Sequence, residues 1–229
     1  ELPETVEPIV VPLPPHAGPG FERLVAAVRE KLPVQRRYAL LAESFSGPMA
    51  IRFASERPAD LVALVLVATF HRSPVSPWLA ALRPLASVLL SRPPPAWATR
   101  HLLAGNDALD DLVRDFREAV RETAPAVLAA RIRTALDADE AGALAACRVP
   151  ILYVGGARDR LLRSAIPNEL KTLQLALELE VLDAPHLVLQ RQPMESARVV
   201  SRFLERAKEP NLAREPRSSA APTCDSVGR

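Results

Sequence analysis

The sequence has few cysteines and no apolar run of membrane-spanning length. Its two cysteines, Cys147 and Cys224, lie far apart among 229 residues, so no disulfide framework is expected and the chain does not require an oxidising compartment. The longest apolar run, residues 61–70, is half as long as a membrane span, which needs about 20 residues. No secretory signal is visible, and we expect a cytoplasmic protein, although the chain begins at Glu1 and an upstream signal could have been lost.

An excess of one charge is also lacking. The formal net charge is +2, and acidic and basic residues are mixed along the chain. The sequence therefore shows no stripe of basic residues of the kind that nucleic-acid binding requires. No His or Cys cluster has metal-ligand spacing, and no glycine-rich phosphate loop is present. We therefore expect no metal, no cofactor and no nucleic-acid partner, while the oligomeric state stays open.

What is present is an alternation of short apolar strands and amphipathic helices. Apolar residues make up 48% of the chain, enough for a buried core. This rhythm is typical of parallel βαβ units. The sequence predicts an α/β fold with a mostly parallel sheet of about five strands and helices on both faces. The predicted strands are residues 6–11, 38–42, 61–68, 149–154 and 179–182.

The rhythm breaks between residues 71 and 146, where only helical periodicity appears. We interpret this interval as a helical lid inserted into a core made of residues 1–70 and 147–208. Trp78, Trp97 and residues 79–90 would line the lid or, equally well, pack it onto the core. Residues 209–229 lack periodicity and are predicted to be a disordered tail.

Ser44 occupies the junction between a predicted strand and the next helix. The segment reads Leu40-Leu41-Ala42-Glu43-Ser44-Phe45-Ser46-Gly47. It resembles the nucleophile elbow of the α/β-hydrolase family, whose pattern is Gly-x-Ser-x-Gly. Ala42 and Ser46 replace the two glycines and are also small. The resemblance implies that Ser44 is the nucleophile and that the Phe45 N–H donates to the oxyanion. The alternative is that Ser44 or Ser46 only caps the helix.

Two later segments match the rest of the family's site. The run from Val149 to Asp159 is a strand, a glycine turn and an acid, and the run from Leu182 to His186 is a strand end, a short loop and a histidine. The order Ser, acid, His is that of the family. The resemblance implies that Asp159 orients His186, which takes the proton of Ser44. Taken singly, Asp159 could be a solvated turn residue and His186 a structural histidine. Asp183 is the second candidate for the acid.

The remaining candidates are weaker. His71 and His101 fall in the helical interval and are interpreted as surface or lid residues. A group of three acids, Asp107, Asp110 and Asp111, is interpreted as the start of an acidic helix face.

The family's early strand and its oxyanion loop have no counterpart in this sequence. His16-Ala17-Gly18-Pro19-Gly20 resembles that loop, but it lies too near Ser44 for the intervening strand and helix to fit. We expect a serine hydrolase that acts on an acyl ester or thioester substrate. The alternative is a truncated, catalytically impaired remnant or a non-catalytic interaction module.

Overall fold

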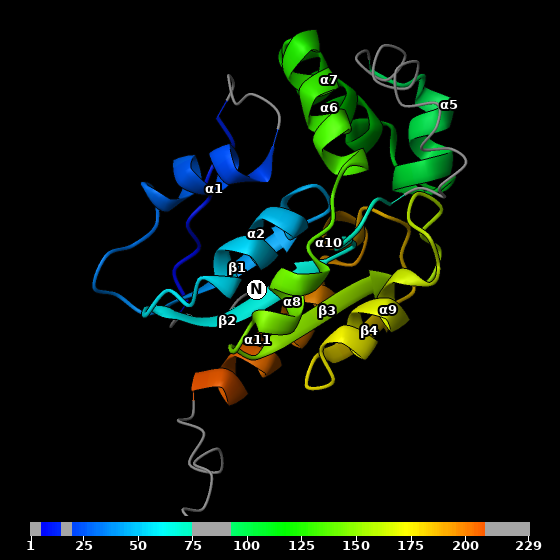
Figure 1. Ribbon diagram of the computed structural model, residues 1–229. Helices are drawn as coiled ribbons and strands as arrows, with labels where there is room; N and C mark the ends of the chain where they lie inside the picture. The colour runs from blue at the N-terminus through cyan, green and yellow to red at the C-terminus, as the bar shows by residue number, and fades with distance from the viewer. Residues whose placement is uncertain (1–5, 15–19, 75–92, 209–229) are drawn as a thin grey trace, which may run out of the picture.

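Four parallel strands form the sheet at the centre of the molecule. The structure is a computed structural model, and it describes residues 6–14, 20–74 and 93–208. The strands are β1 (Tyr38–Glu43), β2 (Leu61–Val67), β3 (Ile151–Gly156) and β4 (Glu178–Leu182), and they pair in the order β1-β2-β3-β4 (Figure 1). The α/β class and the parallel sheet are therefore confirmed. Neighbouring strands are joined by crossovers that contain helices, as parallel pairing requires.

The predicted first strand is wrong. Residues 6–11 form no strand, and Ile9 and Val10 are 52% and 89% exposed. A β-branched run favours a strand only where it finds a partner to pair with. Pro8 and Pro12 lack the N–H groups that a ladder needs. The described part of the sheet thus has four strands rather than about five, and β1 lies at one edge.

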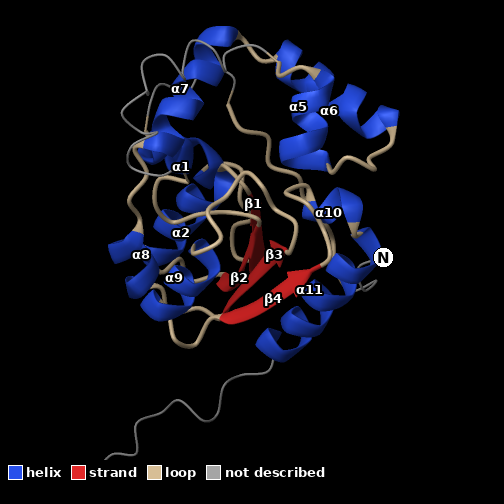
Figure 2. Cartoon of the chain, turned by 90° about the vertical axis from the view of Figure 1, so that its right-hand side faces the viewer, coloured by secondary structure: helices blue, strands red, loops and turns tan. Residues whose placement is uncertain are grey.

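Helices cover both faces of the sheet (Figure 2). On one face lie α1 (Phe21–Arg29), α2 (Ser46–Ser55), α8 (Ala141–Ala146) and α9 (Ile166–Leu173), and on the other lies α11 (Pro193–Lys208). Each face has its own apolar core, because successive side chains of a strand point to opposite sides. Leu64 and Leu66 pack towards α2, whereas Val65 and Val67 pack towards α11.

The described part of residues 71–146 contains helices and no strand. In chain order it contains α5 (Ala96–Thr99), the π-helical turn η1 (Arg100–Ala104), α6 (Asp110–Glu122), α7 (Pro125–Leu136) and α8. We call residues 96–136 the helical segment. Trp97 is 73% exposed on it. Trp78, residues 79–90 and the predicted tail at 209–229 lie outside the described residues, and the role of a lid stays a prediction.

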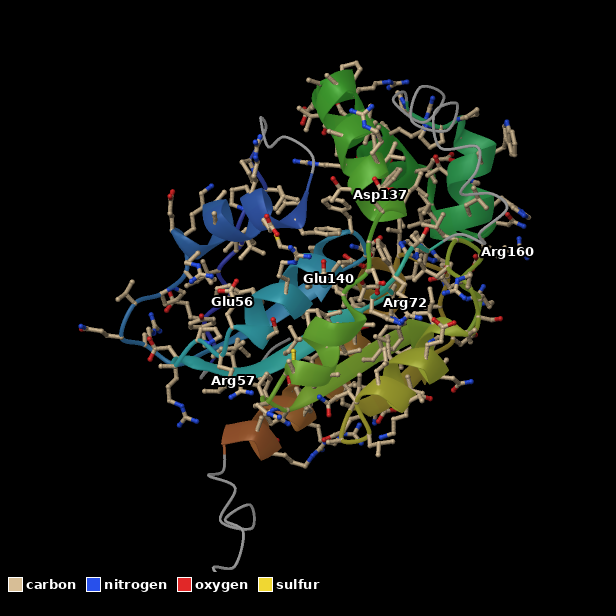
Figure 3. The ribbon with its side chains drawn as sticks, viewed as in Figure 1. Glu56, Arg57, Arg72, Asp137, Glu140 and Arg160 are labelled. Carbon is tan, nitrogen blue, oxygen red and sulfur yellow. The ribbon has the colours of Figure 1, made fainter. Side chains whose placement is uncertain are left out.

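The chain returns from the helical segment to the core at an ion pair whose carboxylate is buried. Glu140, whose side chain is 4% exposed, accepts hydrogen bonds from Arg52 of α2, the shortest at 2.7 Å. Figure 3 shows Glu140 and Arg72 where the chain comes down onto the sheet. The Glu140 backbone N–H also donates to the carbonyl of His71 at 2.7 Å. These bonds fix the start of α8 to the helix that begins beside Ser44.

No helix within residues 6–14, 20–74 or 93–208 is both long and apolar enough to cross a lipid bilayer.

Candidate active site

Ser44 lies in a strained turn between β1 and α2. Its φ angle is 50°, in the left-handed region that non-glycine residues rarely adopt. The Ser44 N–H donates to the carbonyl of Val67 at 2.9 Å, which continues the ladder between β1 and β2. The Gly47 N–H donates to the Ser44 carbonyl at 3.1 Å. The turn is thus held from both sides, and the Ser44 side chain projects beyond the carboxyl end of the strand.

Thr69 supports this turn from the segment that follows β2. It is fully buried, and its hydroxyl donates to the Ser44 carbonyl. A Cβ at Gly47 would lie 1.8 Å from Thr69 Oγ1, so only glycine fits there. The Tyr153 hydroxyl donates in turn to the Thr69 carbonyl at 3.2 Å. The elbow therefore rests on a short chain of buried polar contacts, and the sequence gives no signal of Thr69 or Tyr153.

His186 reaches Ser44 from the loop that follows β4. Its Nε2 lies 2.8 Å from Ser44 Oγ, and its Nδ1 lies 2.8 Å from Asp159 Oδ2. The residue is 2% exposed, so the ring is shielded from solvent. A short helix, α10 (Val188–Arg191), begins two residues later and was not predicted. The structure thus brings together all three residues that the sequence singled out as nucleophile, acid and histidine.

Asp159 lies in the loop after β3, with an 11% exposed side chain. Its Oδ1 accepts the N–H groups of Leu161 at 2.8 Å and Leu162 at 3.1 Å, so both carboxylate oxygens are bonded. Burial by itself would raise the pKa of Asp159. The hydrogen bond and attraction from His186, with the two backbone donors, outweigh it and hold the pKa below its ordinary value. Asp159 is accordingly ionised at neutral pH.

Glu43, directly before Ser44, is a further acid beside the site that the sequence analysis did not single out. Its Oε2 accepts a hydrogen bond from Gln190 of α10 at 3.2 Å, and its Oε1 is buried without a partner. Burial raises the pKa of Glu43, opposed in part by Gln190, His186 and the backbone of Leu189. Its position before the predicted nucleophile is the one signal by which it could have been found.

Phe45 follows Ser44 and precedes the first residue of α2, so its N–H lies at the positive end of that helix. The Phe45 ring packs against Phe21 at a centroid distance of 5.5 Å. In the segment 16–20, which resembles the family's oxyanion loop, residues 16–19 lie outside the described part of the chain. The Gly20 N–H donates to Thr134 Oγ1 at 2.9 Å.

The remaining candidates take no part in the hydrogen bonds that join Ser44, His186 and Asp159. Asp183 is 80% exposed and pairs with Arg158 at 2.7 Å rather than with His186. The interpretation of His71 as a surface or lid residue is wrong, because the residue is only 1% exposed. Desolvation by this burial lowers the pKa of His71. His101 is exposed and contacts Arg160 at 2.9 Å. Within the described ranges, no three His, Cys, Asp or Glu residues are grouped to hold a metal ion.

Solved structures share this architecture, whereas no protein-family model and no curated protein sequence matches the chain. An esterase from Thermogutta terrifontis is 21% identical with a TM-score of 0.68, over 83% of this chain and 74% of its own. An enol-lactonase from Burkholderia xenovorans LB400 is 19% identical with a TM-score of 0.71, over 85% and 75%. An alpha/beta hydrolase enzyme from a Medee basin deep-sea metagenome library is 15% identical with a TM-score of 0.65, over 82% and 73%. The chain therefore has the α/β-hydrolase fold.

Proposed function

We propose that the protein is a serine hydrolase that cleaves an acyl ester or thioester. The observation that carries this proposal is the chain of two hydrogen bonds of 2.8 Å from Ser44 through His186 to Asp159. Serine is a weak nucleophile unless a histidine accepts its proton, and an ionised acid orients that histidine. The similar solved structures include an esterase and an enol-lactonase, and both names denote cleavage of an acyl–oxygen bond.

In the proposed reaction, Ser44 Oγ attacks the acyl carbonyl while its proton passes to His186 Nε2. The ionised Asp159 faces His186 Nδ1, so that nitrogen carries a proton and Nε2 is free to accept one. The Phe45 N–H donates to the oxyanion as it forms. His186 then gives its proton to the leaving alcohol or thiol. A water molecule, deprotonated by His186 in its turn, releases the acid from Ser44.

A panel of p-nitrophenyl esters and acyl thioesters of increasing chain length tests this proposal on the purified chain. We expect saturable hydrolysis that falls by several orders of magnitude in Ser44→Ala and in His186→Ala. Ser55→Ala is the matched control, because Ser55 lies at the far end of α2 and bonds the carbonyl of Arg52. Hydrolysis that survives in Ser44→Ala would refute Ser44 as the nucleophile. No hydrolysis across the panel would favour the alternative of an impaired or non-catalytic chain.

A further inference from the structure

The end of η1 and the turn that follows it contact the loop that carries His186. We call residues 103–108 the brace turn. The Leu187 N–H donates to the carbonyl of Leu103 at 3.0 Å, although the two residues are far apart in sequence. Leu187 also packs against the buried Ala104 and Ala108. Gly105 has a φ of 90°, and a Cβ there would lie 3.4 Å from Pro185. The brace turn therefore lies against the peptide on both sides of His186.

Asp107 of the brace turn joins the two loops that hold the predicted triad. Its Oδ2 lies 2.6 Å from Arg191 Nη2, and its Oδ1 lies 3.9 Å from Arg158 Nη1. Arg158 directly precedes Asp159, and Arg191 is the last residue of the helix that follows His186. Arg158 also donates to the side chain and carbonyl of Asp183, at 2.7 and 3.2 Å. One carboxylate of the helical segment thus bridges cations from both loops.

The contact to Arg191 matters more than an ordinary surface ion pair. The Arg191 side chain is 18% exposed, and its Nε is buried without a hydrogen-bond partner. Removing the carboxylate beside a largely buried cation leaves that charge uncompensated, which favours a rearrangement of α10. A further polar contact joins the same parts of the molecule, where Arg160 Nη1 lies 2.9 Å from His101 Nδ1 of η1. Polar contacts therefore attach the helical segment to the loop that carries Asp159 and to the short helix that follows His186.

We propose that Asp107 is a positioning residue that holds the Asp159 loop and the His186 loop together through Arg158 and Arg191. Docking of the helical segment then adds to the direct contact between Arg158 and Asp183 in aligning the three predicted catalytic residues. This inference rests on the proposed function, because it assumes that the aligned residues perform the reaction.

The test compares Asp107→Asn with Asp111→Asn in the 229-residue chain. Asn keeps the shape of Asp and removes its charge, and Asp111 is an exposed acid of the same segment that pairs with Arg114. We expect Asp107→Asn to lower kcat about fivefold or more, with little change in KM, and Asp111→Asn to match the wild type. Asp107→Glu, which keeps the charge, should recover part of the loss.

Proton NMR gives a readout that needs no substrate. The proton between His186 Nδ1 and Asp159 is expected as a downfield resonance that weakens in Asp107→Asn and persists in Asp111→Asn. An unchanged kcat and an unchanged resonance in Asp107→Asn would overturn the inference. A wild-type chain that shows the resonance but hydrolyses no ester would instead defeat the proposed function.

Salt titration keeps the inference testable if Asp107→Asn fails to fold. Asp107 is 62% exposed, so added salt should screen its contacts. We expect the rates of wild type, Asp111→Asn and Asp107→Glu all to fall with potassium chloride, because all three proteins keep a negative charge at position 107. Rates that do not change with potassium chloride would contradict the inference.

Discussion

At the scale of single residues, the site combines one acid of lowered pKa with one of raised pKa. Asp159 has a hydrogen-bond donor on each oxygen, and Glu43 has one donor and one buried bare oxygen. Burial acts to raise the pKa of both acids, and only at Asp159 do the hydrogen bonds and the attraction of His186 outweigh it. Only Asp159 is bonded to His186, which makes it the acid expected to orient the ring.

Replacing Asp159 by Asn is expected to lower kcat by about 10⁴, the loss that accompanies a wrongly oriented histidine tautomer in serine hydrolases. Asp183→Asn serves as the control, since this exposed acid pairs with Arg158. Steady-state ester hydrolysis measures both variants. A larger loss in Asp183→Asn than in Asp159→Asn would contradict the assignment of the acid.

Glu43→Gln is expected to stabilise the protein at neutral pH. Because folding raises the pKa of Glu43 above 4.5, the folded chain binds this proton more tightly than the unfolded chain does. Stability contributed by the proton is therefore lost as the pH rises through the folded pKa. Gln carries no charge and avoids that loss, so the gain should disappear in acid, below about pH 4.

Thermal unfolding of Glu43→Gln and wild type between pH 4 and 8 measures this difference, with the exposed Glu122→Gln as the control. Equal unfolding temperatures at neutral pH, or a gain that grows in acid, would show that the buried carboxylate is not destabilising.

At the scale of elements, glycines permit the close approaches that align the loops. A Cβ at Gly156 would lie 2.4 Å from the Pro185 carbonyl oxygen and 2.5 Å from that of Ala184. These are backbone atoms of the His186 loop, and they cannot move without moving His186. The last residue of β3 thus sets how close the acid loop comes to the histidine loop.

Gly156→Ala is therefore expected to abolish most ester hydrolysis and to destabilise the fold by about 1–3 kcal/mol, the usual cost of overpacking. Gly142→Ala is the matched control, because a Cβ there meets nothing within 4 Å and Gly142 lies inside α8. Alanine there should stabilise the protein by about 0.5–1 kcal/mol. Urea unfolding and ester hydrolysis report both effects, and a fully active Gly156→Ala would contradict the account.

Elements with strong local patterns could be predicted from the sequence. The four observed strands match four of the five predicted strands to within a few residues, because each is a largely apolar run with a clear end. The convergence of Ser44, Asp159 and His186 could be predicted because each follows a strand of one parallel sheet, and the carboxyl ends of those strands share an edge. Their catalytic roles stay predictions.

Features that depend on long-range contacts could not be predicted. Residues 6–11 have strand-like composition, but the sequence does not tell whether a partner strand accepts them. Residues Thr69 and Asp107 have ordinary sequence surroundings, and only the fold places them against the Ser44 turn and the His186 loop. The environment of His71 likewise comes from residues far away in the sequence, since the Glu140 N–H donates to its carbonyl and Glu169 Oε2 lies 3.8 Å from its Nε2.

At the scale of the whole molecule, β1 is an edge strand of the sheet that carries an exposed apolar side chain. In the described part of the chain, β1 pairs only with β2, and Leu41 on β1 is 45% exposed. An unpaired edge strand with apolar residues favours pairing with another chain. We hypothesise that this edge limits solubility.

Leu41→Lys is accordingly expected to reduce self-association, which sedimentation velocity measures over a range of protein concentrations. Leu175→Lys is the control, because Leu175 is 78% exposed but follows α9 outside the sheet. Equal effects of the two lysines would indicate general apolar adhesion instead of strand pairing, and a monomeric wild type would refute the hypothesis.

The central claim is that the chain of contacts from Asp159 through His186 activates Ser44, and covalent labelling tests it most directly. The purified chain is incubated with a fluorophosphonate, and the modified residue is mapped by peptide mass spectrometry. The account predicts one adduct, on Ser44, in the wild type, and its loss in His186→Ala, where Ser44 is retained but no base accepts its proton. An unlabelled wild type, or labelling of Ser44 that is equally fast in His186→Ala, would contradict the account.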